Sequence, residues 1–276
     1  YVNERYLVEL VTFFDKFLRI RELGILTIII VFVVVASIID PRFLTFDSWR
    51  AVFMAIPLIL VMAMGQMMVI ICRHVDISIG SILAFAAIAI GLIFIEYPNT
   101  PLWVAIIITA FVGAIMGLIN GIIVTKFNVH SIIVTLGTLS LYRGLVFIVS
   151  GGRQIDRNDI PLSIISFSQT SFLFSIPSIL ITSTIIVLIT HYMMRHTIIG
   201  REIYATGSNP VAAHLKGINV TKITLFVFTL CGMLSGIAGL FYASRFGYVN
   251  PGVTGVGIEF IVIAGVIIGG TSITGG

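Results

Sequence analysis

Residues 102–125 read LWVAIIITAFVGAIMGLINGIIVT, a run that contains no charged side chain. A helix needs about 20 mostly apolar residues to cross a hydrocarbon core about 30 Å thick, so this run is long enough to span a membrane. Within it, Gly113, Gly117 and Gly121 are four residues apart and share one helix face. Small residues at this spacing let helices approach closely in lipid, so the run also predicts a tightly packed neighbour.

The composition of the whole chain agrees with this interpretation. Of the 276 residues, 58% are apolar and 10% are charged, against about 25% charged residues in an ordinary soluble domain. With a mean hydropathy of +1.13, a soluble globule would expose more apolar surface than water tolerates. Soluble enzymes, nucleic-acid-binding proteins and disordered tails are therefore excluded. The two cysteines lie inside apolar runs and form neither a disulfide framework nor a metal-ligand spacing.

Runs of the same kind recur along the chain and predict an all-α, polytopic membrane helix bundle with about eight spans. The first and last runs are short, and the third is also brief. The predicted spans are 24–39, 51–71, 78–95, 102–125, 132–149, 173–194, 223–242 and 258–270.

Basic residues predict the orientation of these spans. With a cytoplasmic N-terminus and one crossing per run, about twice as many Lys and Arg residues lie inside as outside, as the positive-inside rule requires. The strongest inside cluster is 195–222, and the N-terminal segment adds Arg5, Lys16 and Arg19. We therefore expect a cytoplasmic N-terminus.

The cytoplasmic loop 195–222 contains a short predicted helix, 210–216. Asn209 supplies an N-cap oxygen, Pro210 occupies the first helical position, and Gly217 is a stop signal. A helix of two turns is marginal in water, so it must pack against something. Two interpretations remain open: packing against the chain's own bundle, or insertion into a cytoplasmic partner, which the loop's length and four basic residues favour.

Charged residues inside or beside the spans are candidates for a polar pathway. Asp76 ends the second span, where it or Ser78 either caps the next helix or lines a broken-helix site, with Arg73 as a nearby partner. Arg143 lies within a span, where an arginine costs about 2.5–3.5 kcal/mol even on the mild insertion scale. It must therefore face protein or a cavity. Glu259 opens the last run and either pairs with Arg143 or Arg245 or lies at the membrane interface.

Four stretches carry a resemblance to a known family. GREIYATGSNPVAAHLKGINV, from residue 200, resembles the coupling segment of permeases in ATP-binding-cassette (ABC) importers for simple sugars such as ribose, xylose, galactose and rhamnose. The stretches 65–81, 119–152 and 257–276 resemble three further blocks of that family, so the match covers most of the chain from about residue 50. TLGTLSLYRG is most similar to rhamnose and autoinducer-2 permeases. His74 departs from the family pattern, in which a small residue is usual.

The resemblance implies a type II-importer-like permease domain over 1–276 that continues beyond Gly276 to about ten spans in the bacterial inner membrane. It implies a second permease chain, identical or related, a cytoplasmic ATPase dimer and a periplasmic substrate-binding protein. It further implies an ATPase contact at Asn209, Pro210, Ala212, Ala213, Leu215 and Gly217. The candidate translocation path contains Asp76, Ser78, Asn120, Thr135, Thr138, Arg143 and Glu259. Hydroxyl and amide groups in such a path bind a neutral sugar without the desolvation cost of a charge, although interhelical hydrogen bonding is an alternative role.

Motifs for catalysis are missing from the sequence. It contains no G-x4-G-K-[ST] phosphate loop, no HExxH and no G-x-S-x-G. We therefore expect no catalytic residues, no metal site and no cofactor. We expect the chain to contact the lipid bilayer and to bind no nucleic acid. The energy source must then lie on another polypeptide. The alternative function is a stand-alone ion-coupled secondary transporter or channel. It would need a titratable group near the bilayer midplane, whereas the mid-span charge here, Arg143, does not carry protons.

Overall fold

The computed structural model describes residues 21–169, 171–173 and 176–276. The N-terminal basic residues Arg5, Lys16 and Arg19, which contribute to the predicted orientation, lie outside these ranges. The chain divides into two compact units, residues 1–53 and residues 54–276. Each unit is described by itself.

The first unit contains α2 (Arg21–Ile39), the 3-10 helix η1 (Pro41–Leu44) and the start of α3 (Phe46–Ile71). Asp40 caps η1, and its carboxylate accepts a hydrogen bond from the N–H of Arg42 at 2.9 Å. A row of aromatic rings follows, with Phe43 against Trp49 at 6.1 Å between centroids and Trp49 against Phe53 at 6.2 Å. This capped turn and aromatic row order the link between α2 and α3.

Within the described ranges, six helices are long and apolar enough to cross a membrane, which confirms the all-α membrane fold. Two shorter apolar helices, Gly24–Ile39 and α12 (Ile258–Ile268), correspond to the first and last predicted runs. The six are α3, α4 (Ile79–Glu96), α5 (Leu102–Phe127), α6 (Ser131–Ser150), α8 (Ser178–His196) and α11 (Val220–Phe246). The predicted run 173–194 begins too early, because two short strands, β1 (Ser171–Leu173) and β2 (Ile176–Pro177), precede α8.

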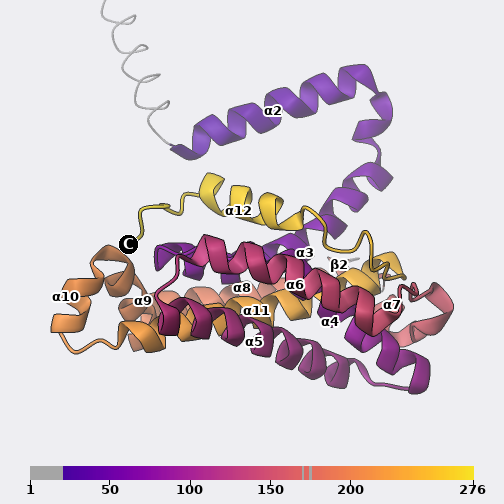
Figure 1. Ribbon diagram of the computed structural model, residues 1–276. Helices are drawn as coiled ribbons and strands as arrows, with labels where there is room; N and C mark the ends of the chain where they lie inside the picture. The colour runs from indigo at the N-terminus through magenta and orange to yellow at the C-terminus, as the bar shows by residue number, and fades with distance from the viewer. Residues whose placement is uncertain (1–20, 170, 174–175) are drawn as a thin grey trace, which may run out of the picture. The chain divides into compact units, whose positions relative to one another are not determined.

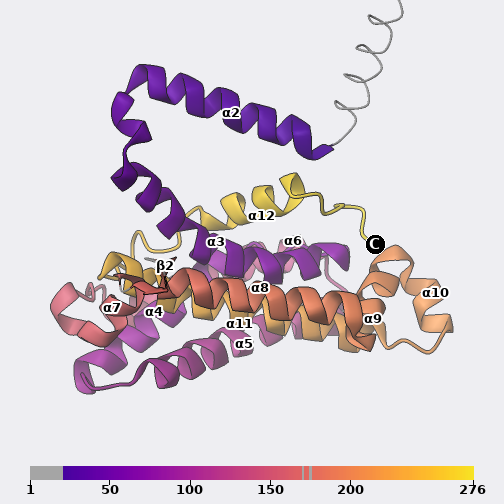
Figure 2. The ribbon, with the colours of Figure 1, turned by 180° about the vertical axis from the view of Figure 1, so that it is seen from behind.

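Within residues 54–276, α11 packs against both α5 and α4, and Figures 1 and 2 show α11 alongside α5 from opposite sides. Glycines set the distance between α5 and α11. A Cβ atom at Gly113 would lie 2.9 Å from the Cα of Gly236, and one at Gly232 would lie 2.8 Å from the Cα of Gly117. The predicted close packing is confirmed for these glycines.

Short elements occupy the two ends of the bundle. At one end, α9 (Ile198–Ser208) and α10 (Pro210–Leu215) follow α8, and the C-terminal residue lies beside them. We call this the α10 end. At the other end, the 3-10 helix η2 (Arg157–Asp159) and α7 (Leu162–Gln169) connect α6 to the strands. We call this the α7 end. Apolar side chains on the outer faces of α5 and α8 are exposed, as a lipid environment requires.

Candidate functional site

A buried polar cluster forms where the connection 72–78 joins α3 to α4. The carboxylate of Asp76 accepts hydrogen bonds from the N–H of Ser78 at 2.9 Å and from its hydroxyl at 2.7 Å. The amide of Asn120, on α5, donates to the Ser78 hydroxyl oxygen at 2.8 Å and to the Asp76 carboxylate at 3.3 Å. All three side chains are buried. These donors satisfy a carboxylate whose burial would otherwise be costly.

Two further polar residues complete the cluster, and the sequence analysis missed both. The side-chain amide of Gln66 pairs with the main chain of Asp76, donating to its carbonyl and accepting from its N–H at 3.2 Å each. The hydroxyl of Tyr142 lies 3.1 Å from the side-chain oxygen of Asn120 and 2.9 Å from the carbonyl of Met116. The feature of the sequence that could have identified them is that each is a polar residue inside an otherwise apolar run.

The capping interpretation of Asp76 is wrong in detail. Ser78 precedes α4 but makes no side-chain cap bond, and Asp76 bonds Ser78 rather than the free N–H groups of the first helical turn. The suggested partner of Asp76 is also wrong. Arg73 bonds instead to the carbonyls of Gly207 and Ser208 at the end of α9, at 2.6 Å each.

The predicted threonines of α6 lie nearby, and Thr135 bonds both its own helix and the connection 72–78. The hydroxyl of Thr135 donates to the Ser131 carbonyl at 2.9 Å and also lies 3.3 Å from the Val75 carbonyl. The Ser131 hydroxyl in turn accepts from the Val75 N–H at 3.1 Å. Thr138 makes only a long bond, 3.4 Å, to the Thr135 carbonyl. The start of α6 therefore holds the connection 72–78 in place.

Arg143 and Glu259 do not form the suggested ion pair. One guanidinium nitrogen of Arg143 donates to the Thr254 carbonyl at 2.6 Å. Glu259 is 6% exposed, and its Oε2 atom has no hydrogen-bond partner in the described part of the chain. The carboxylate faces Gly80 in the first turn of α4 and interacts electrostatically with Arg143. In the described part of the chain, a salt bridge with an N–O distance of 3.4 Å joins Arg153 to Asp159.

The segment α9–α10 has the local structure that the sequence predicts. The side chain of Asn209 accepts from the N–H groups of Val211 at 3.1 Å and Ala212 at 3.0 Å. The helix ends one residue earlier than expected, with Lys216 as its C-cap and Gly217 at a φ of 84°. Asn209 thus separates α9 from α10 and starts the shorter helix.

One face of α10 is apolar and uncovered. Ala213 is 3% exposed and packs inward, whereas Val211 is 71% and Leu215 is 81% exposed. Figure 2 shows α10 projecting from one end of the bundle. The helix therefore packs on its own bundle through Ala213, while its two largest apolar side chains stay exposed, so both interpretations of this helix stay open.

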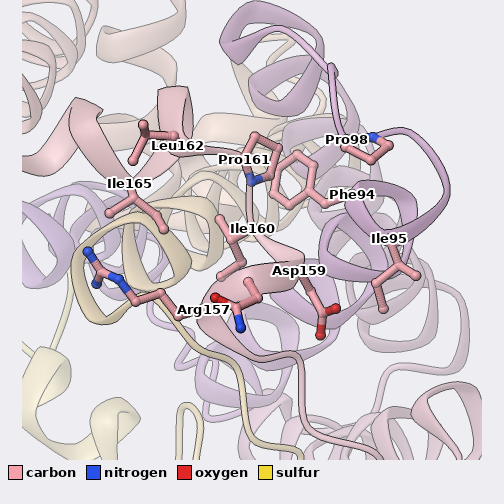
Figure 3. Close-up of a pocket in the computed structure, with 10 residues that line it drawn as sticks. Phe94, Ile95, Pro98, Arg157, Asp159, Ile160, Pro161, Leu162 and Ile165 are labelled. Carbon is pink, nitrogen blue, oxygen red and sulfur yellow. The ribbon is translucent and has the colours of Figure 1, made fainter.

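The opposite, α7 end carries a pocket of about 470 Å³. Its lining combines apolar side chains, such as Phe94 and Pro161, with the charged Arg157 and Asp159 (Figure 3). The main chains of Ile155 and Val249 form an isolated antiparallel β-bridge with two hydrogen bonds of 2.9 Å each. This bridge connects the two loops at this end. The segment after α6 and the segment after α11 are thus joined.

His74, in the connection 72–78, lies 5.7 Å from the ring of Phe228 between centroids. Burial against apolar groups lowers the pKa of His74 to about 4, and the nearby His130 adds to the effect. His74 is therefore neutral near pH 7. No group of three or more His, Cys, Asp or Glu side chains in the described ranges is arranged to hold a metal ion.

Comparison with known proteins gives consistent results. Residues 49–276 match the family described as the permease component of the branched-chain amino acid transport system. The ribose import permease protein RbsC of Haemophilus influenzae is 36% identical over 254 residues, covering 90% of this chain and 76% of that protein. The autoinducer 2 import system permease protein LsrC of Enterobacter sp. is 33% identical over 259 residues, covering 94% of this chain and 74% of that protein. No solved structure matches.

Proposed function

This chain belongs to the family of permease components of the branched-chain amino acid transport system, and from that premise we propose that it carries a sugar-like molecule across the bacterial inner membrane. It is the permease subunit of an ABC importer. We infer the substrate class from the relatives named for ribose and autoinducer 2, and not from the branched-chain amino acids in the family's description. A monosaccharide suits a path whose hydrogen-bonding groups near Asn120 are largely uncharged.

The observation that carries the proposal is the exposed apolar face of α10. A two-turn helix does not hold its shape alone in water, yet Asn209 caps it and Val211 and Leu215 point outward. Such a helix fits a groove on a partner, as in helix-in-groove recognition. We assign the groove to a cytoplasmic ATPase dimer. The α10 end then faces the cytoplasm, with Arg73, Arg201 and Lys216 on the side that the positive-inside rule requires.

The opposite end meets the substrate-binding protein. Arg153 is exposed there beside Asp159, and Arg157 borders the pocket of the α7 end. Charged groups on an exposed rim steer association with a complementary partner. A second permease chain, identical or related, completes the pathway, and the connection 72–78 provides the irregular backbone that membranes tolerate only inside protein or beside a cavity.

A reconstitution experiment tests the proposal. The permease, its ATPase and its binding protein are assembled in proteoliposomes, and ATP hydrolysis and ribose uptake are measured with Leu215→Gln and the exposed control Lys222→Gln. We expect Leu215→Gln to reduce binding-protein-stimulated hydrolysis about tenfold, because it removes the apolar anchor, and the control to leave it unchanged. Equal stimulation in both variants would contradict the coupling role. Uptake driven by an ion gradient without the ATPase would instead support a secondary transporter.

A further inference from the structure

The ends of α3 and α12 are two copies of one structural motif. Residues 69–71 and 266–268 both read Val-Ile-Ile and both finish a helix. The N–H of Arg73 bonds the carbonyl three residues back at 2.9 Å, and the N–H of Gly270 does the same at 3.0 Å. In each copy the next residue bonds the carbonyl five residues back, at 3.0 Å and 3.2 Å. This pair of bonds is the Schellman motif, which places a left-handed residue after the helix.

The copies also agree after the helix end. In the first, the Asp76 side chain accepts from the N–H of Ser78 at 2.9 Å and its hydroxyl at 2.7 Å. In the second, the Ser272 side chain accepts from the N–H of Thr274 at 3.3 Å, and the two hydroxyls lie 2.7 Å apart. The two loops therefore serve as an internal comparison for each other.

The copies differ at the left-handed position. Gly270 has a φ of 109° and carries no side chain, as is usual at such a position, whereas Arg73 has a φ of 64°. A non-glycine residue is energetically unfavourable in this conformation. An unfavourable backbone persists where the surrounding structure requires it, and it points to a role of the side chain.

The side chain of Arg73 reaches the end of α9. Its Nε donates to the Gly207 carbonyl and its Nη2 to the Ser208 carbonyl, at 2.6 Å each. These carbonyls belong to the negative end of the α9 dipole, where a cation is stabilising, and bonds from a charged donor are stronger than neutral ones. Asn209, the N-cap of α10, is the next residue. One guanidinium thus holds the point at which α10 begins.

The junction around Arg73 is tight. A Cβ atom at Gly207 would collide with the carbonyl of Ile71, and one at Gly275 would lie 2.9 Å from Arg73 Nε. The N–H of Gly276 donates to the Ile71 carbonyl at 3.2 Å. The ends of α3 and α9 and the loop after α12 therefore meet in close contact beside the guanidinium.

Resting on the proposed function, we propose that Arg73 is the positioning residue that transmits movement of α10 to the buried Asp76 cluster. A movement of α10 and α9 displaces the guanidinium that bonds to α9. The main chain connects Arg73 to Asp76 through Val75, whose N–H donates to the hydroxyl of Ser131 at 3.1 Å. When the ATPase shifts α10, the connection 72–78 moves with it, and the hydrogen bonds of Ser78 and Asn120 to Asp76 rearrange.

Hydrogen exchange of the complete importer tests this link without knowledge of the transported molecule. The probe is Mg-ATP with vanadate, which holds the ATPase in one state, and exchange is followed in 72–78 and in 198–216. We compare Arg73→Gly, which accepts the left-handed backbone but lacks the guanidinium, with the control Arg201→Gln, which removes the same charge from an exposed position of α9.

In the wild type and the control, we expect trapping of the ATPase with vanadate to change the hydrogen-exchange rates of both segments at least about fivefold. The reason is that the local opening that permits exchange depends on local contacts. In Arg73→Gly, the change in 198–216 remains and the change in 72–78 falls below about twofold. A full response of 72–78 in Arg73→Gly, or none in the wild type, overturns the role of Arg73. No response of 198–216 in the wild type overturns the proposed function itself. If Arg73→Gly fails to assemble, Arg73→Asn, which tolerates the left-handed backbone and also lacks the guanidinium, replaces it with the same expected outcomes.

Discussion

The amide of Asn120 donates a hydrogen bond to the hydroxyl of Ser78 across 2.8 Å, although 42 positions separate the two residues in the chain. This bond joins α5 to the start of α4. It makes the break between α3 and α4 part of a buried network, because Ser78 in turn donates to Asp76.

Asn120→Ala should destabilise the protein and reduce transport. The substitution leaves buried acceptors of Ser78 and Asp76 with one donor fewer, which costs about 1–3 kcal/mol. The melting temperature in detergent should fall by several degrees, since about 1 kcal/mol corresponds to about 2–4 °C in a chain of this size. Asn158→Ala, at an exposed loop position, is the control. An unchanged melting temperature for Asn120→Ala would show that the network contributes nothing to stability.

Two matched N-caps separate coupling from stability. Asn209 caps α10 and Asn219 caps α11, and both accept from main-chain N–H groups at about 3.0 Å. Replacing either by Ala costs about 1 kcal/mol. Asn209→Ala should lower binding-protein-stimulated ATP hydrolysis with little change in melting temperature, because α10 carries few internal contacts. Asn219→Ala should lower the melting temperature and preserve stimulation. The reverse pattern would place the ATPase contact elsewhere.

The glycine contact between α5 and α11 should not tolerate side chains. In Gly232→Ala the new methyl group would approach the Cα of Gly117 to 2.8 Å, so the helices must separate. We expect a lower yield and a lower melting temperature. Gly144→Ala on α6 has open space within 4 Å and should stabilise its helix by about 0.5–1 kcal/mol. Comparable melting temperatures for the two variants would disprove close packing at this contact.

Acid should weaken the fold through His74. Its pKa in the folded protein is lowered to about 4 from 6.5 by burial, so between these values the unfolded chain binds more protons than the folded one. Stability is therefore fully present above pH 6.5 and is lost as the pH falls toward 4. Melting temperatures are measured between pH 7.5 and 4.5, a range of about three units that covers most of the pKa shift of His74. They should fall less steeply with decreasing pH for His74→Gln than for the wild type. His191→Gln, at an exposed position, should follow the wild type; identical slopes for all three would remove His74 as the cause.

Long apolar runs and local caps could be read directly from the sequence. A run such as 102–125 must be helical in lipid, because every main-chain polar group has to bond within its own segment. The Asn209 cap depends on residues two and three positions away, so its signal is local. The boundary of α8 was missed because an apolar run does not reveal the short strands before it.

The partners of the polar side chains depended on how the helices pack. Arg73 was expected beside Asp76, three residues away, yet its guanidinium bonds carbonyls at 207 and 208. Gln66 and Tyr142 stand out in the sequence as polar residues inside apolar runs, but nothing in the sequence names their partners. Apolarity is a property of each residue and survives in the linear order, whereas a hydrogen bond between helices exists only when packing brings donor and acceptor within about 3 Å.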